Sequence, residues 1–498
     1  MSSNKRENCN LPFAASLLPF YALFYTLYIL CLGALALWLW QWLTRGHSKH
    51  GRKALSDSLG EMACLGLLLN YVLYLLLHES RELVWLIAVP ASLGLMRLVK
   101  PCRALDSGRR HWKLGVLLLL FTPFVVATLY EPLHLLDARY IWYHHARAFW
   151  MFDYAELAPY LRDVYFTHSN YPKLLPVMGA QIAGVFGFWN DVLPKIASAS
   201  LLMLFLLSAC SFGRNFWITA AASFIMAPVF VLTGGYADGP LAVYALLVVA
   251  ALASFMELAN HPASYHPSRL NLHQTSCLRL ALLASGVALN LKNEGVLFVA
   301  CLLAAYVLFY WGRRGCHFPR LCTVVMLSRF VFKNRCWWPW WLAGLAPFVL
   351  WQVLSRHWGL ENDLAINAGL MHNLAHRLPD LEAWKTYGVF LFIYAGNKIG
   401  WILLAASICV AAEYRYCGRL YAHSLLAYTV AALYFLAMTL VYFGTPYEMS
   451  WHLRTSVLRT MYLPMTLCIY SIVASASHLL ASAPARSQKG VYKWPLTP

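Results

Sequence analysis

The sequence predicts an all-α polytopic membrane protein. Of its 498 residues, 60% are hydrophobic and only 12% are charged, whereas soluble domains carry roughly 25% charged residues. The mean hydropathy is +0.55. Apolar runs of the length needed to cross a bilayer, about 20 residues, recur along the chain. The 20 Trp and 29 Tyr residues suit the aromatic belts at membrane interfaces.

We interpret about 13 apolar segments as membrane spans. The first run is too long for the core of a signal peptide, and we interpret it as a retained anchor. The predicted spans lie at about 15–40, 60–77, 83–99, 114–130, 195–212, 216–234, 240–258, 279–291, 295–311, 337–355, 387–412, 420–443 and 460–482.

The stretch LLPVMGAQIAGVFGFWN, residues 174–190, decides the topology of everything after it. If it does not cross the membrane, the basic loops at 44–53, 97–113 and 312–336 all lie on one side, as the positive-inside rule requires. We therefore predict a juxtamembrane or re-entrant helix within a long outer loop, 131–193. Because the net charge of +18 sits largely in such short loops, we interpret it as a topology signal and not as nucleic-acid binding.

This threading divides the chain into three parts. Residues 1–113 form an N-terminal membrane extension of three helices, 114–482 form the main transmembrane module, and 483–498 form a basic cytoplasmic tail. The 131–193 loop and the turns at 234–240, 291–295 and 444–459 share the outer face. We expect a multi-pass protein of the bacterial inner membrane whose outer face is periplasmic.

Carboxylates at the ends of spans are candidates for function, because an ionisable group at membrane depth costs roughly 2.5–3.5 kcal/mol. Asp137, Asp238 and Glu294 are such residues on the outer face. Two structural alternatives stay open: Asp238 caps a helix, or Lys292 pairs with Glu294 in a tight turn. Lys398 lies about ten residues inside the predicted span 387–412, so either the span breaks there or the lysine meets an anionic partner.

Five short motifs on the outer face occur in a fixed order. They are Asp137-Ala138…Trp142, Tyr171-Pro172…Pro176, Tyr236-Ala237-Asp238, Lys292-Asn293-Glu294-Gly295 and Trp451-His452-Leu453…Ser456…Arg459. With these motifs, over about residues 114–480, the chain resembles the GT-C superfamily of integral-membrane glycosyltransferases. It is most similar to a bacterial set in the branch of protein O-mannosyltransferases and lipid A aminoarabinose transferases.

The resemblance implies transfer of a sugar from a polyprenyl-phosphate donor to a glycan, lipid or protein acceptor, with inversion and with Asp137 as general base. Asp238 matches an acidic residue of the second outer loop. Ala138 stands where many relatives have Glu, so the role of that Glu is either lost or supplied by another residue, such as Glu131 or Glu294. The implied phosphate-binding residues are Arg139, Lys173, Lys292, His452 and Arg459. Tyr140, Trp142 and Tyr143 would stack on the sugar ring, and Tyr171 is a further substrate-binding candidate.

Purely structural roles are open for several of these residues. Arg139 can snorkel to lipid headgroups, the aromatic residues can serve as interfacial belts, and the 451–459 stretch can be an anchor. No ligand spacing demands a metal, although Asp137 with Asp238 or Glu294 offers oxygen ligands for Mg²⁺ or Mn²⁺. The main competing function is a transporter or flippase of an amphipathic, lipid-linked substrate. A non-catalytic scaffold would explain the spans but not the clustered carboxylates.

Overall fold

The computed structural model describes most of the chain, and every regular element in the described ranges is a helix. This confirms the all-α prediction for that part of the protein. The described residues are 17–44, 55–80, 122–130, 137–163, 168–209, 212–226, 229–259, 272–314, 338–360, 368–394 and 398–489.

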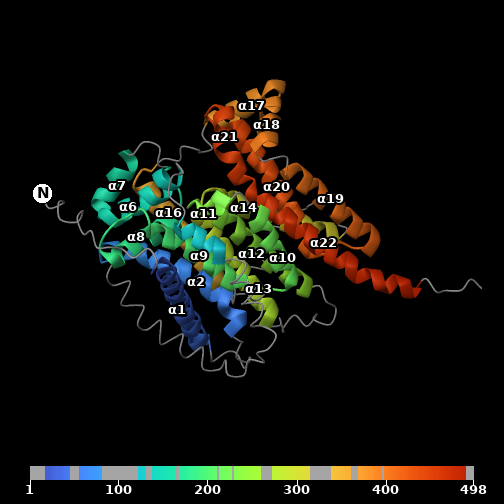
Figure 1. The fold of residues 1–498 in the computed structure, drawn as a ribbon, viewed down its shortest axis with the longest axis horizontal. Helices are drawn as coiled ribbons and strands as arrows, with labels where there is room; N and C mark the ends of the chain where they lie inside the picture. The colour runs from blue at the N-terminus through green and yellow to red at the C-terminus, as the bar shows by residue number, and fades with distance from the viewer. Residues whose placement is uncertain are drawn as a thin grey trace, which may run out of the picture.

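The described helices follow one another along the chain as coloured in Figure 1. Their bounds are α1 Leu18–Thr44, α2 Leu55–Leu76, η3 His78–Ser80, η5 Ala138–Tyr143, α6 His144–Met151, α7 Tyr154–Asp163, α8 Leu174–Phe186, α9 Leu193–Ala209, α10 Arg214–Met226, α11 Val229–Thr233, α12 Asp238–Ala259, α13 Leu272–Leu291, α14 Glu294–Arg314, α16 Trp338–His357, α17 Ala368–Arg377, α18 Leu381–Tyr394, α19 Lys398–Cys417, α20 Ala422–Gly444, α21 Met449–Thr460 and α22 Tyr462–Lys489.

Six stretches of the described chain are helical, long and apolar enough to cross a membrane: α1, α2, α12, α19, α20 and the α21–α22 stretch 449–482. The membrane character predicted from composition is thereby supported. The predicted number of about 13 spans is not confirmed, because six such helical stretches are found among the described residues. Helices α8, α9 and the apolar part of α14 are shorter. The predicted span 83–99, the first half of 114–130 and the basic loop 97–113 lie outside the described residues.

Two predicted boundaries can be compared with the described helices. Within the predicted span 387–412, α18 is described as far as Tyr394 and α19 from Lys398, whose side chain is exposed. Residues 395–397 lie outside the described residues, so both interpretations of Lys398 stay predictions. The tail predicted from residue 483 begins within α22, which ends at Lys489.

Helix α12 occupies the centre of the bundle and is apolar on all sides, as expected for a helix without a solvent face. It packs against α9, α13, α20 and α22. Helices α1 and α2 lie side by side at one flank, α19, α20 and α22 at the other (Figure 1). Helices α17 and α18 stand with α21 at one end of the molecule (Figure 1).

Helix α8 covers the stretch that sequence analysis assigned to a juxtamembrane or re-entrant helix. Its 13 residues span about 20 Å, which is short of the roughly 30 Å hydrocarbon core. It ends at Gly187, whose φ of 72° is left-handed, a conformation that glycine adopts without steric cost. Its length therefore suits the predicted role.

Candidate active site

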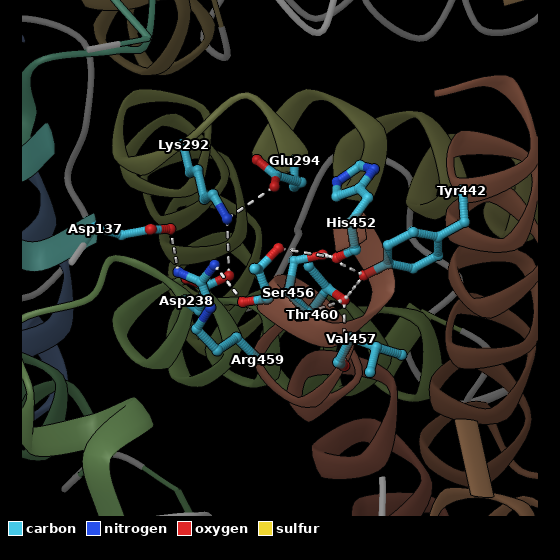
Figure 2. A network of polar contacts seen from close by, with 11 residues as sticks. Asp137, Asp238, Lys292, Glu294, Tyr442, His452, Ser456, Val457, Arg459 and Thr460 are labelled. Carbon is cyan, nitrogen blue, oxygen red and sulfur yellow. Dashed lines mark hydrogen bonds and ion pairs between the residues drawn. The ribbon is translucent and has the colours of Figure 1, made fainter. Parts of the chain in front are cut away.

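Four segments that are distant in the sequence meet at one point of the fold. Asp137 precedes η5, Asp238 opens α12, Lys292 and Glu294 flank the junction of α13 and α14, and Arg459 lies in the last turn of α21. Figure 2 shows their side chains pointing toward one another. All five were candidates from the sequence, and we call them the ion-pair network.

Alternating charges link the members of the network. Arg459 Nη1 lies 2.5 Å from Asp137 Oδ2 and 3.8 Å from Asp238 Oδ2. Lys292 Nζ lies 2.9 Å from Asp238 Oδ1 and 2.8 Å from Glu294 Oε1 (Figure 2). Three carboxylates thus face two cations, so the network has a net charge of minus one.

Burial divides the network into an inner and an outer part. The side chains of Asp238, Lys292 and Arg459 are 4%, 7% and 8% exposed, and that of Asp137 is 35% exposed. Buried charges are stable only when they are paired, which the inner members are. Asp137 is therefore the member that can meet a partner from outside.

Helix ends explain why these charges stand where they do. Asp238 and Glu294 lie in the first turns of α12 and α14, where the helix dipole favours carboxylates. Lys292 directly follows α13, whose C-terminal end favours a cation. The predicted pair of Lys292 with Glu294 is confirmed, but Lys292 also reaches Asp238. At Gly295 any Cβ would collide with the carbonyl oxygen of Ala288, so glycine permits the close approach of α14 to α13.

Burial by itself lowers the pKa of Lys292. The carboxylates of Asp238 and Glu294 outweigh this effect and raise the pKa above its ordinary value. Lys292 is therefore a cation at all physiological pH values. Two of its three N–H donors point to these two carboxylates.

One face of α21 carries His452, Ser456 and Arg459, spaced by four and three residues as neighbours on a helix are. Helix α20 holds this face in place. The hydroxyl of Tyr442 lies 3.0 Å from Ser456 Oγ and 2.6 Å from Thr460 Oγ1 (Figure 2). Tyr442 was not a candidate from the sequence, because nothing in its own helix distinguishes it from other buried tyrosines.

The connection between α20 and α21 is fixed by α17. Arg377 Nη1 donates to the Thr445 carbonyl oxygen at 2.8 Å, and Nη2 donates to that of Tyr447 at 3.2 Å. Asn373 Nδ2 donates to the Thr445 oxygen at 2.9 Å. Thr445 in turn places its hydroxyl 2.9 Å from Nδ1 of His452. The late basic motif is thus positioned by a helix outside the motif.

Tyr236 supports Arg459 from one side. The Arg459 guanidinium lies 4.5 Å from the centre of the Tyr236 ring, a cation–π contact. Burial and the nearby carboxylates raise the pKa of Tyr236 to about 12, against the opposing effect of Arg459. The preceding Gly235 has a φ of 81°, and a Cβ there would meet the Tyr143 ring. Tyr236 belongs to a motif identified from the sequence but was not among the candidate residues.

Two of the predicted binding residues lie away from the network. Arg139 and Tyr140 are exposed on η5, and the Arg139 guanidinium lies 6.0 Å from the Tyr140 ring. Trp142, by contrast, is buried, with its ring centre 5.8 Å from that of Tyr171. Tyr171 stacks on His168 at 4.8 Å. These aromatic residues pack against one another beneath the outer surface.

Lys173, a predicted phosphate-binding residue, is fully buried in the ligand-free structure. Its Nζ lies 3.0 Å from His145 Nδ1 and 5.2 Å from the Trp351 ring centre. Since lysine only donates, His145 Nδ1 accepts, and its ring is neutral. Burial first, and then the Lys173 cation, hold the pKa of His145 well below its usual range.

The residues do not fit a divalent metal ion well. Among the described residues, no group of three or more His, Cys, Asp or Glu side chains is arranged to hold one. The three carboxylates of the network instead have Lys292 and Arg459 between them. The positive charge that Mg²⁺ or Mn²⁺ would supply is already provided by these two side chains.

Comparisons with protein-family models, with curated proteins and with solved structures find no match.

Proposed function

We propose that the protein is a membrane glycosyltransferase of the GT-C type, which transfers a sugar from a polyprenyl-phosphate donor to an acceptor hydroxyl. The observation that carries the proposal is the pair of Asp137 and Arg459, which are 322 positions apart in the sequence and 2.5 Å apart in space. A partly exposed carboxylate stands next to a buried guanidinium. General base and phosphate ligand are the two groups that this reaction needs.

Asp137 serves as the base in this proposal. One of its oxygens takes the proton of the acceptor hydroxyl while the hydroxyl oxygen forms a bond to the anomeric carbon. The bond between that carbon and the phosphate oxygen breaks, and polyprenyl phosphate leaves with the electron pair. General base catalysis typically contributes about 10²–10⁴-fold. A single displacement of this kind inverts the anomeric configuration.

Arg459 and Lys292 are proposed to stabilise the departing phosphate. Arginine binds phosphate oxygens with two parallel N–H groups, and Lys292 retains one N–H donor beyond the two that face Asp238 and Glu294. Because both cations are buried, their effect on a developing negative charge is stronger than in water. His452 lies about two turns before Arg459 on the same face of α21 and can contribute to donor binding.

The site lies where apolar helices end, which suits a donor with a lipid tail. Asp238 and Glu294 are the first residues of α12 and α14. The membrane-length apolar stretch of α12 begins at Asp238. A polyprenyl chain can therefore stay in the bilayer while its phosphate reaches the network. In this proposal the site faces the periplasm of a bacterial inner membrane, and the acceptor is a glycan, a lipid or a protein.

The test is a transfer assay with the purified protein in liposomes, using radiolabelled polyprenyl-phosphate hexoses and pentoses. We expect turnover by the wild type and a rate about 10²–10⁴-fold lower for Asp137→Asn. Asp163→Asn, an exposed carboxylate at the end of α7, is the matched control and should keep the wild-type rate. Full turnover by Asp137→Asn would remove that residue from the role of base.

A transporter or flippase of lipid-linked substrates is the second candidate. Lys398, a lysine at the first described position of the membrane-length helix α19, favours it, because ionisable residues within membrane spans often mark substrate pathways. A scrambling assay with fluorescent lipid phosphate in the same liposomes separates the two functions. Lipid movement without sugar transfer would support the transporter, and transfer without movement the enzyme.

A further inference from the structure

Two carboxylates compete for one guanidinium in the network. Arg459 Nη1 donates to Asp137 at 2.5 Å but stays 3.8 Å from Asp238 Oδ2, which is beyond hydrogen-bond range. Asp238 Oδ2 and Arg459 Nε are buried, and neither has a hydrogen-bond partner among the described residues. Buried polar atoms are rarely left in this state. Asp238 Oδ2 therefore offers a second acceptor to the guanidinium, whose Nη2 meanwhile donates to the Thr455 carbonyl oxygen at 2.9 Å.

Pairing of Arg459 with Asp137 and pairing with Asp238 leave different carboxylates free. With Arg459 on Asp137, the carboxylate that is 35% exposed is occupied, and the carboxylate that is 4% exposed is incompletely satisfied. A charge-assisted hydrogen bond has a length of about 2.7–2.9 Å, so a shift of about 1 Å toward Asp238 would complete it. That shift would release Asp137. Figure 2 shows Arg459 between the two carboxylates.

A phosphate anion is the ligand that would drive this shift. It would bind the guanidinium, whose Nη1 already donates to Asp137, the most exposed of the three carboxylates. The network has one negative charge in excess, so an anion binds more favourably when it displaces a carboxylate than when it joins three of them. The displaced carboxylate, Asp137, is the one that can turn outward to water or to an acceptor.

We propose that Arg459 is a two-position guanidinium, bound by Asp137 in the ligand-free protein, and that a lipid-linked phosphate displaces Asp137 while Asp238 takes up the guanidinium. The exchange rests on the proposed function, and it sets the order in which donor and acceptor bind. The donor phosphate binds first, and its binding frees the Asp137 carboxylate to receive the acceptor hydroxyl. The base is engaged by Arg459 until a donor is present.

The test measures equilibrium binding of farnesyl phosphate, a short polyprenyl phosphate, to the full chain in detergent. Removal of the competing carboxylate in Asp137→Asn should tighten binding by about 10- to 100-fold, the factor that corresponds to one hydrogen bond to a charged group. Arg459→Gln should weaken binding by a similar factor. Farnesol, which lacks the phosphate, should bind all variants equally.

Two controls separate release of Arg459 from a general charge effect. Glu294→Gln removes one negative charge from the same network without freeing Arg459 and should tighten binding less than Asp137→Asn. Glu382→Gln, in an exposed ion pair with Lys385, should change nothing. Unchanged or weaker binding by Asp137→Asn, or equal tightening by Glu294→Gln, would overturn the exchange. A thermal melt of each variant checks folding, and Arg459→Lys replaces Arg459→Gln if the latter does not fold.

The outcome is independent of sugar transfer. If the wild type transfers no sugar from any donor but Asp137→Asn binds farnesyl phosphate more tightly, the exchange stands and the glycosyltransferase proposal fails. If Asp137→Asn abolishes transfer but leaves the affinity for farnesyl phosphate unchanged, the exchange fails and the enzyme proposal stands.

Discussion

Replacing Lys292 by methionine should destabilise the protein strongly. The side chain keeps its approximate length, but Asp238 and Glu294 lose the cation that bridges them at 2.9 Å and 2.8 Å. These carboxylates are only 4% and 16% exposed, so water screens them little. Removal of one partner from a buried ion pair typically costs about 3–5 kcal/mol, and we expect a loss of that size in the free energy of unfolding.

The matched control is Lys385→Met. Lys385 forms an equally close pair with Glu382, at 2.5 Å, but the two side chains are 59% and 74% exposed. Exposed pairs contribute about 0–1 kcal/mol because solvent screens them. Unfolding in mixed micelles, followed by helical circular dichroism, measures both variants. The reasoning is refuted if Lys292→Met costs no more than Lys385→Met. Adding Asp238→Asn to Lys292→Met should restore part of the loss.

The contribution of Lys292 to stability should depend on pH. The pKa of Lys292 is raised in the folded protein by Asp238 and Glu294, which outweigh the opposing effect of burial. A raised lysine pKa stabilises the fold fully below the unfolded value of about 10.4 and loses its effect as the pH rises above it. The difference in stability between wild type and Lys292→Met should be constant from about pH 7 to 9 and shrink at more alkaline pH.

Three further predictions follow from positions around the network. Tyr442→Phe should cost about 1–2 kcal/mol, because the hydroxyls of Ser456 and Thr460 lose one of their partners, and should reduce affinity for farnesyl phosphate. Tyr244→Phe, with only a 3.4 Å contact, should change affinity little. Arg377→Gln should lower the melting temperature and weaken lipid-phosphate binding, with partial rescue by Arg377→Lys. Burial and then Lys173 lower the pKa of His145, so the melting temperature should fall as the pH drops below about 6.5, and His145→Asn should flatten that decline.

Composition and local pattern were enough to predict several features. Long apolar runs predicted the helical, membrane-type chain, because each such run must satisfy its own backbone hydrogen bonds in lipid. The motif that contains His452, Ser456 and Arg459 was recognised from the order of its residues, but the face that they share became visible only with helix α21. The Lys292–Glu294 pair could be anticipated because two residues at a tight turn are close in any fold.

Helix boundaries were harder to predict than helix existence. The basic tail was predicted to begin at residue 483, where the apolar run ends, yet α22 continues to Lys489. Hydropathy marks the end of an apolar run but not the end of a helix, because polar residues such as Arg486, Gln488 and Lys489 are good helix formers.

By itself, then, the sequence determined the class of chain, its apolar helices and the short polar motifs that separate them, because these depend on residues close together along the backbone. Only the tertiary structure decided which charges meet. It paired Asp137 with Arg459, joined Lys292 to Asp238 as well as to Glu294, and buried Lys173 against His145. Such contacts are set by how whole helices pack. The hydrophobic pattern around Asp137 carries no information about a partner that lies 322 positions away.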